Sequence, residues 1–109
     1  RATAPIDGVF ATDDLAAAEV LEWARTRNLS VPSDLSIIGF DGTETMRRAL
    51  PHLATIRQPI EDIARAAVSI LLDQIEGKAP RSSSDEAGAP RAQTVEFSGT
   101  LIQGRSINA

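Results

Sequence analysis

The sequence contains no cysteine, and its only histidine is His52. Disulfide bridges and thiolate nucleophiles are therefore excluded, and a zinc site built from Cys or His side chains is disfavoured. No stretch approaches the ~20 consecutive apolar residues of a transmembrane helix, and none has the pattern of a secretory leader. We expect a protein that needs no metal or cofactor and makes no membrane contact.

Basic residues are also scarce. The chain has 11 Lys and Arg against 15 Asp and Glu, a net charge of -4, and no run of basic residues. Because nucleic-acid binding depends on neutralising phosphates with Lys and Arg, we expect this chain not to contact DNA or RNA directly.

What is present is typical of a globular domain, with 42% hydrophobic and 24% charged residues. The apolar run 35–40 has β-branched residues at its centre, which favours a strand buried on both faces, as in a parallel sheet. Asp41 and Gly42 follow it directly. In open α/β sheets the carboxyl ends of the strands face the ligand crevice, so Asp41 is a candidate binding residue.

The remaining pattern alternates strands with helices and predicts an α/β fold. We expect three mainly parallel strands with flanking helices and a C-terminal strand pair. The predicted strands span 6–11, 35–40, 52–57, 94–97 and 100–103, and the predicted helices span 14–27, 43–50 and 60–76.

Polar side chains follow each of the first three predicted strands. They are Asp13 and Asp14, then Asp41, then Arg57 and Gln58. If the strands are parallel, these side chains share one edge, where carboxylates can accept hydrogen bonds from ligand hydroxyls or an amine. Purely structural interpretations stay open: the aspartates can cap a helix or close a turn, Arg57 can pair with an acid, and Gln58 can cap the following helix.

Two enzymatic alternatives use the same acids. Clustered aspartates can hold Mg²⁺ for phosphoryl transfer, and paired carboxylates can hydrolyse glycosides. The sequence has no glycine-rich phosphate loop, catalytic-lysine motif or nucleophile motif that would accompany such chemistry. We therefore expect no catalytic activity.

Four stretches, taken together, resemble a known family. They are DGVFATDDLAA at 7–17, VPSDLSIIGFD at 31–41, LATIRQPI at 53–60 and LIQGRS at 101–106. In this order and spacing they closely resemble the C-terminal part of the sensor domain in the lactose/galactose-repressor family of bacterial transcription regulators. The resemblance covers nearly the whole chain apart from the Ser/Pro-rich segment.

The resemblance implies a fold and a function. Family members carry an N-terminal helix-turn-helix domain and a two-lobed sensor like type I periplasmic binding proteins. A small effector, often a sugar or nucleobase, binds between the lobes and changes how the dimer holds operator DNA. We therefore expect a piece of a cytoplasmic, homodimeric, repressor-type regulator that reaches DNA only through a domain outside this chain. A sugar-binding protein of a transport system with the same fold is the alternative.

Individual residues carry over in the same way. The resemblance assigns effector binding to Asp41 and Asp13 and places Gln58 at the lobe junction, and we expect Arg57 to line the same crevice. Asp13 stands where the family usually has Asn or Ser, which favours a ligand rich in hydrogen-bond donors. The helix 14–27 resembles one that joins the dimer interface, and its candidate contact residues are Leu15, Ala18, Glu22 and Trp23.

The expected organisation has four parts. Residues 1–58 form the effector-binding lobe, 59–77 a crossover helix, 78–93 a flexible loop longer than usual, and 94–109 strands that return to the lobe. In the family, the crossover helix packs on an N-terminal lobe that this sequence does not include. Alone, we expect that helix to fold onto its own sheet or to be covered by another copy of the chain.

Overall fold

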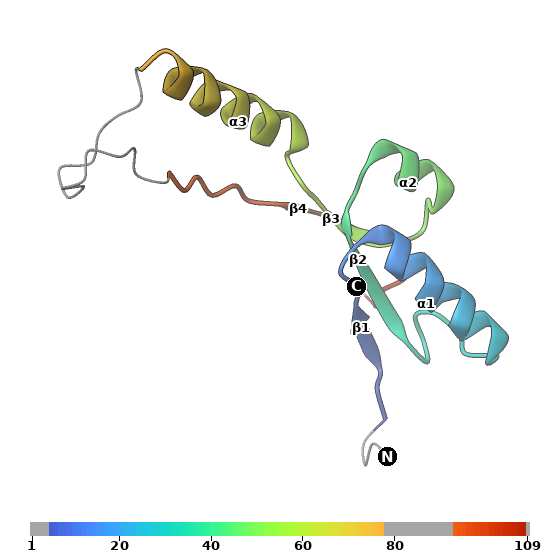
Figure 1. The fold of residues 1–109 in the computed structure, drawn as a ribbon. Coiled ribbons are helices and arrows are strands. Elements are labelled where there is room, and N and C mark those ends of the chain that lie inside the picture. The colour runs from blue at the N-terminus through green and yellow to red at the C-terminus, as the bar shows by residue number, and fades with distance from the viewer. Residues whose placement is uncertain (1–4, 78–92, 109) are drawn as a thin grey trace. The chain divides into compact units, whose positions relative to one another are not determined.

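The computed structural model describes residues 5–77 and 93–108 (Figure 1). Its elements run in the order β1 Gly8–Phe10, α1 Asp14–Thr26, β2 Ser36–Asp41, α2 Glu44–Ala49, β3 Ala54–Arg57, α3 Ile60–Ile75 and β4 Thr100–Ile102. The chain divides into two compact units, Arg1–Gln58 with Gly99–Ala109, and Pro59–Ser98. Each unit is described by itself.

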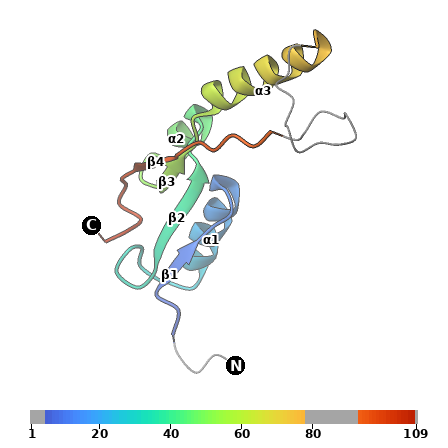
Figure 2. The same cartoon turned by 90° about the vertical axis from the view of Figure 1, so that its left-hand side faces the viewer.

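The first unit is built on one open sheet with the strand order β1-β2-β3-β4 (Figure 2). β1 pairs with β2 and β2 with β3 in parallel, and β4 pairs antiparallel with β3. The register sets Gly39 opposite Thr55 and Asp41 opposite Arg57. The predicted α/β fold is confirmed, and the carboxyl ends of the parallel strands share one edge.

The predicted C-terminal strand pair is only half correct. β4 forms as expected, but residues 94–97 are not a strand. Val95 is 52% and Phe97 39% exposed, so their alternation does not mark a buried face. In the part of the chain that the structure describes, residues 93–98 have no backbone ladder, and a strand without a paired neighbour is not stable.

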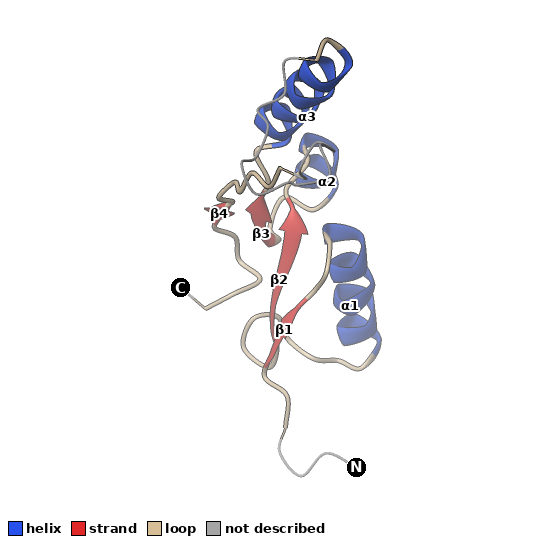
Figure 3. Cartoon of the chain, turned by 60° about the vertical axis from the view of Figure 1, so that its left-hand side comes forward, coloured by secondary structure: helices blue, strands red, loops and turns tan. Residues whose placement is uncertain are grey.

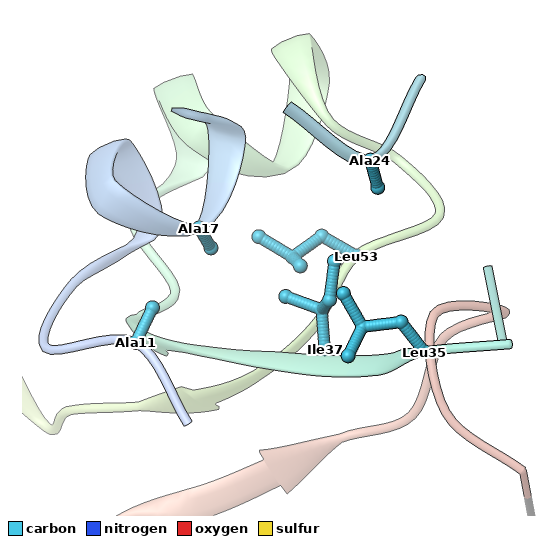
Figure 4. Packing of buried hydrophobic residues seen from close by; sticks show 6 residues of the cluster. All are labelled: Ala11, Ala17, Ala24, Leu35, Ile37 and Leu53. Carbon is cyan, nitrogen blue, oxygen red and sulfur yellow. The ribbon is translucent and has the colours of Figure 1, made fainter. Parts of the chain in front are cut away.

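Helix α1 lies along the sheet and supplies two of the six core residues (Figure 3). Ala17 and Ala24 are fully buried and point from the helix toward Leu53 and Ile37 (Figure 4). Two small residues one heptad apart bring the helix close to the strands, so that the larger side chains fill the space between. The core cluster comprises Ala11, Ala17, Ala24, Leu35, Ile37 and Leu53.

Local chemistry defines both ends of α1. The Asp13 carboxylate caps the first turn by accepting from the backbone N–H of Ala16 at 2.7 Å. Asn28 ends the helical segment in the left-handed conformation, with a φ of 58°. The position of α1 is thus fixed by local chemistry as well as by the core.

In the C-terminal segment, Ser106 joins β2 to β3 near the starts of the two strands. Its hydroxyl donates to the carbonyl of Ile37 at 2.6 Å and accepts from the N–H of Ala54 at 2.7 Å. Its backbone accepts from Ile37 at 2.7 Å and donates to the carbonyl of His52 at 3.1 Å. Gly104 permits this approach, because a Cβ there would lie 2.5 Å from the His52 carbonyl.

The second unit is dominated by α3, a helix of 16 residues with no buried residue. Its exposed large apolar side chains are Ile60, Val68, Leu71, Leu72 and Ile75. Gly77 follows the helix with a φ of 72°. The loop expected at 78–93 lies, apart from its last residue, outside the described residues. No helix within residues 5–77 and 93–108 is long and apolar enough to cross a membrane.

The Ser106 hydroxyl provides a direct stability test. Ser106→Ala leaves the buried N–H of Ala54 without its acceptor, so we expect unfolding to become easier by about 2 kcal/mol. Urea denaturation followed by circular dichroism measures the change. Ser33→Ala, at an exposed turn position, is the matched control and should change stability by less than about 0.5 kcal/mol. Equal midpoints for the two variants would contradict the bridging role of Ser106.

Candidate functional site

Asp41 and Gln58 meet at the carboxyl edge of the sheet. The Gln58 side-chain amide donates a short hydrogen bond to Oδ1 of Asp41. The backbone N–H of Gln58 also donates to the carbonyl of Asp41 at 3.0 Å. Gln58, which follows β3, is therefore bonded to Asp41, which ends β2, through both its main chain and its side chain. The alternative that Gln58 caps α3 is wrong, because α3 has no side-chain cap.

The backbone at the end of β2 has an uncommon conformation. Asp41 has a φ of 117° and Gly42 a φ of 64°. A non-glycine residue with such a φ is strained, and residues held in this way cluster at binding and catalytic sites. Gly42 could not carry a side chain, because a Cβ there would lie 2.8 Å from the Cα of Arg57. The turn presents the Asp41 carboxylate at the edge.

Asp14 has a different role from the one expected of it. Its side chain is 2% exposed and accepts two hydrogen bonds, from the Gly42 N–H at 2.9 Å and the Thr55 hydroxyl at 2.6 Å. Its Oδ1 would lie 2.2 Å from a Cβ on Gly39. Asp14 is therefore a buried link between the start of α1, the residue that follows β2, and Thr55 within β3. The interpretation of Asp14 as only a helix-capping residue is wrong.

One signal in the sequence could have located this link. Gly39 interrupts a run of β-branched and aromatic residues, and an isolated glycine inside a strand often marks a close approach by another group. The group that approaches is the Asp14 carboxylate. Its hydrogen-bond partner Thr55 lies opposite Gly39 on β3.

Asp13 lies beside Asp14 at the same edge of the sheet. One of its oxygens caps α1 through Ala16, which confirms the structural interpretation of this residue. Its second oxygen accepts no hydrogen bond from another described side chain or backbone group. The cap therefore leaves one carboxylate oxygen of Asp13 for other donors.

Arg57 ends β3 with an exposed side chain. Within residues 5–77 and 93–108 Arg57 forms no ion pair, so the described part of the chain does not support the interpretation that Arg57 pairs with a nearby acid. Over the same residues, no group of three or more His, Asp or Glu is placed to hold a metal ion. The magnesium alternative therefore gains no support from the described part of the chain.

A hollow of about 470 Å³ lies at the opposite edge of the sheet, near the starts of β2 and β3. Its apolar lining comes from Leu21, Val31, Ala49, Leu50, Pro51 and Leu53. The residues that line this hollow include no carboxylate and no side-chain amide, whereas the Asp41 edge brings several such groups together. We place the candidate site at the Asp41 edge.

The outward face of α1 carries the residues expected at a dimer interface. Leu15 is 66% and Trp23 48% exposed, and the Arg27 guanidinium lies over the Trp23 ring at 5.5 Å. Glu22 accepts two hydrogen bonds from Arg25, which lower the pKa of the Glu22 carboxyl. With the partly exposed Ala18, these residues form what we call the α1 outer face: Leu15, Ala18, Glu22 and Trp23.

The turn after β2 can be tested through Gly42. Gly42→Ala must adopt a positive φ and also place its Cβ against Arg57, so we expect a loss of more than about 2 kcal/mol in unfolding free energy. Asn28→Ala is the control, because it meets a similar φ of 58° and should cost only about 1 kcal/mol. Chemical denaturation of both variants separates backbone strain from the contact, and equal losses would contradict the close approach to Arg57.

Comparison with known proteins gives a consistent picture. A family model described as a periplasmic binding protein-like domain matches residues 1–107. The sucrose operon repressor of Streptococcus mutans is 44% identical over 70 residues, covering 64% of this chain and 22% of that protein. The ribose operon repressor of Halalkalibacterium halodurans is 40% identical over 73 residues, covering 67% and 22%. The chain thus spans under a quarter of the length of these relatives.

A solved structure shows the same arrangement. A LacI family transcriptional regulator from Arthrobacter sp. FB24, crystallised in complex with lactose, superposes with a TM-score of 0.71 and 29% sequence identity. The superposition covers 94% of this chain and 35% of that one. The likeness therefore extends over both the candidate edge and α1.

Proposed function

Because this chain belongs to the family of periplasmic binding protein-like domains, the sensor domain of LacI-type repressors, we propose that it is the effector-sensing C-terminal lobe of a bacterial transcription regulator. The observation that carries the proposal is the strained Asp41, held by Gln58 at the carboxyl edge of a parallel sheet. This edge is where open α/β sheets bind small molecules.

The effector is a small molecule rich in hydroxyl or amine donors, with a sugar as the best fit. Asp41 and Asp13 offer carboxylate oxygens, which accept hydrogen bonds but cannot donate them when ionised. Gln58 orients Asp41, and the exposed Arg57 supplies a donor at the same edge. The lactose complex of the Arthrobacter regulator supports a sugar as the ligand class.

In the intact regulator, the effector would bind between this lobe and a second lobe outside the chain. Binding shifts an equilibrium between two sensor conformations, and the output is occupancy of operator DNA by a separate DNA-binding domain. The lobe itself performs no catalysis. The relatives named above are operon repressors, which supports a regulator over a transport receptor with the same fold.

We also assign the α1 outer face to a homodimer interface and the segment 59–77 to packing against the second lobe. Leu15 and Trp23 are large, exposed apolar side chains on the same helix, which is the composition of an interface core. The apolar side chains of α3 are exposed on a helix with no buried residue. Both surfaces would be covered in the complete dimer.

Asp41 provides the test of effector binding. Titration calorimetry of the intact protein with sucrose, ribose and lactose identifies which sugar binds. Asp41→Asn keeps an oxygen for the Gln58 amide but removes the charge that strengthens hydrogen bonds from the ligand, so we expect its affinity to fall about tenfold or more. Asp7→Asn makes the same charge change at the opposite end of the strands and should leave the affinity unchanged. If both variants bind the sugar as tightly as the wild type, the proposed site is wrong.

The dimer assignment can be tested separately. Leu15→Lys places a charge on the α1 outer face in place of its most exposed apolar side chain, and we expect the dimer dissociation constant to rise about tenfold or more. Sedimentation velocity of the intact protein over a concentration series measures it. Ile6→Lys is the control, because Ile6 is 70% exposed and precedes β1. A dimer that Leu15→Lys leaves as tight as Ile6→Lys would exclude α1 from the interface.

A further inference from the structure

We propose that Asp14 is a positioning residue that sets the orientation of the Asp41 carboxylate without touching the ligand itself. Asp14 is buried, and its two hydrogen bonds go to Gly42 and Thr55 and not to Asp41. It acts instead on the peptide group that follows Asp41. That Asp41 binds an effector rests on the proposed function, whereas the positioning of Asp41 by Asp14 does not.

The peptide group between Asp41 and Gly42 is held at both of its polar ends. Its carbonyl accepts from the backbone N–H of Gln58 at 3.0 Å. Its N–H donates to Oδ2 of Asp14 at 2.9 Å. A peptide group fixed at both ends cannot rotate about the bonds that flank it, so ψ of Asp41 and φ of Gly42 are set together.

This double hold explains why Asp41 keeps a φ of 117°. Sparsely populated backbone conformations persist only when the surrounding structure over-determines them. Gln58 donates one hydrogen bond to the Asp41 carbonyl and one to the Asp41 side chain. Asp14 accepts the hydrogen bond from the N–H of the same peptide group, which belongs to Gly42. Without Asp14, the buried N–H of Gly42 would lose its acceptor, and rotation of the peptide would relieve both the unpaired donor and the strain.

The Asp14 carboxylate is itself locked in place. Its other oxygen accepts from the Thr55 hydroxyl at 2.6 Å, and the same oxygen fills the space above Gly39. Gly39 and Thr55 are partners across β2 and β3, so Asp14 sits over one rung of the sheet. A hydrogen bond donated to such a fixed carboxylate is better aligned than one donated to a mobile side chain.

Nuclear magnetic resonance of the full chain tests the proposal without a ligand. The Gly42 amide reports its bond to Asp14, and the side-chain amide of Gln58 reports the position of the Asp41 carboxylate. In Asp14→Ala we expect hydrogen exchange at Gly42 to accelerate about tenfold or more, and the Gln58 side-chain signals to move toward those of a free glutamine amide.

Two further variants make the test decisive. Asp14→Asn keeps the shape of the side chain but offers Gly42 an uncharged oxygen, so the Gly42 and Gln58 signals should shift together by a smaller amount. This variant decides the matter if Asp14→Ala does not fold. Thr55→Val is the matched control, because it removes the hydrogen bond that holds the Asp14 carboxylate in place but keeps the acceptor of the Gly42 N–H, so the Gln58 signals should move much less than in Asp14→Ala.

The proposal is overturned if Gly42 responds to Asp14→Asn or Asp14→Ala while the Gln58 side-chain signals remain at their wild-type positions. It is also overturned if Thr55→Val moves those signals as far as Asp14→Ala does, since Asp14 would then act only through general stability. If the Gln58 signals follow Asp14 but no sugar binds to the intact protein, the positioning role stands and the proposed function fails.

Discussion

The parallel pairing of β2 with β3 is the constraint on which the rest of the structure depends. Its register puts Asp41 opposite Arg57, which makes Gln58 the next residue along and brings it within reach of Asp41. Because side chains alternate between the faces of a sheet, a shift by one residue would turn Gly39 and Thr55 away from Asp14. The candidate site therefore exists only in this register.

Two buried polar side chains support that register by bonding to both strands. Ser106 binds Ile37 and Ala54 near the starts of the strands, and Asp14 binds Gly42 after β2 and Thr55 within β3. Each comes from a distant part of the chain, one from the C-terminal segment and the other from the start of α1. Buried polar groups are costly unless their hydrogen bonds are satisfied, and within the described residues none of the buried side-chain polar atoms lacks a partner. The polar contacts therefore make the pairing specific, whereas Ala17, Ile37 and Leu53 supply the apolar burial.

The sequence predicted the local features of this fold well. The buried strand at 35–40 and the cap by Asp13 each depend on residues close together in the chain. The position of Asp41 at the edge followed from the alternation of strands and helices, because parallel strands must end on the same side. The strand predicted at 94–97 failed because alternation alone does not provide a neighbour to pair with.

The sequence did not predict the links that hold the site together. Asp14 at the first turn of a helix has the ordinary signature of an acid at the positive end of the helix dipole. Only the folded structure, in which the start of α1 lies over Gly39 and Thr55, shows that the Asp14 carboxylate connects α1 with β3 and with the turn after β2. Ser106 is similar, since nothing in the sequence around this serine indicates its four bonds, which go to Ile37 in β2, to Ala54 in β3 and to His52 just before β3.

Helix α1 joins the two surfaces to which we assign function. Its first residue, Asp14, is bonded to the turn after Asp41, and its outer face carries Leu15 and Trp23. A helix of 13 residues is about 20 Å long, so α1 connects the Asp41 turn to the whole length of its outer face. The buried contacts of Ala17 and Ala24 allow only discrete arrangements, because a close-packed interface resists gradual sliding. If the outer face joins two copies of the chain, the bond from Gly42 to Asp14 is the most direct physical route from effector to dimer geometry.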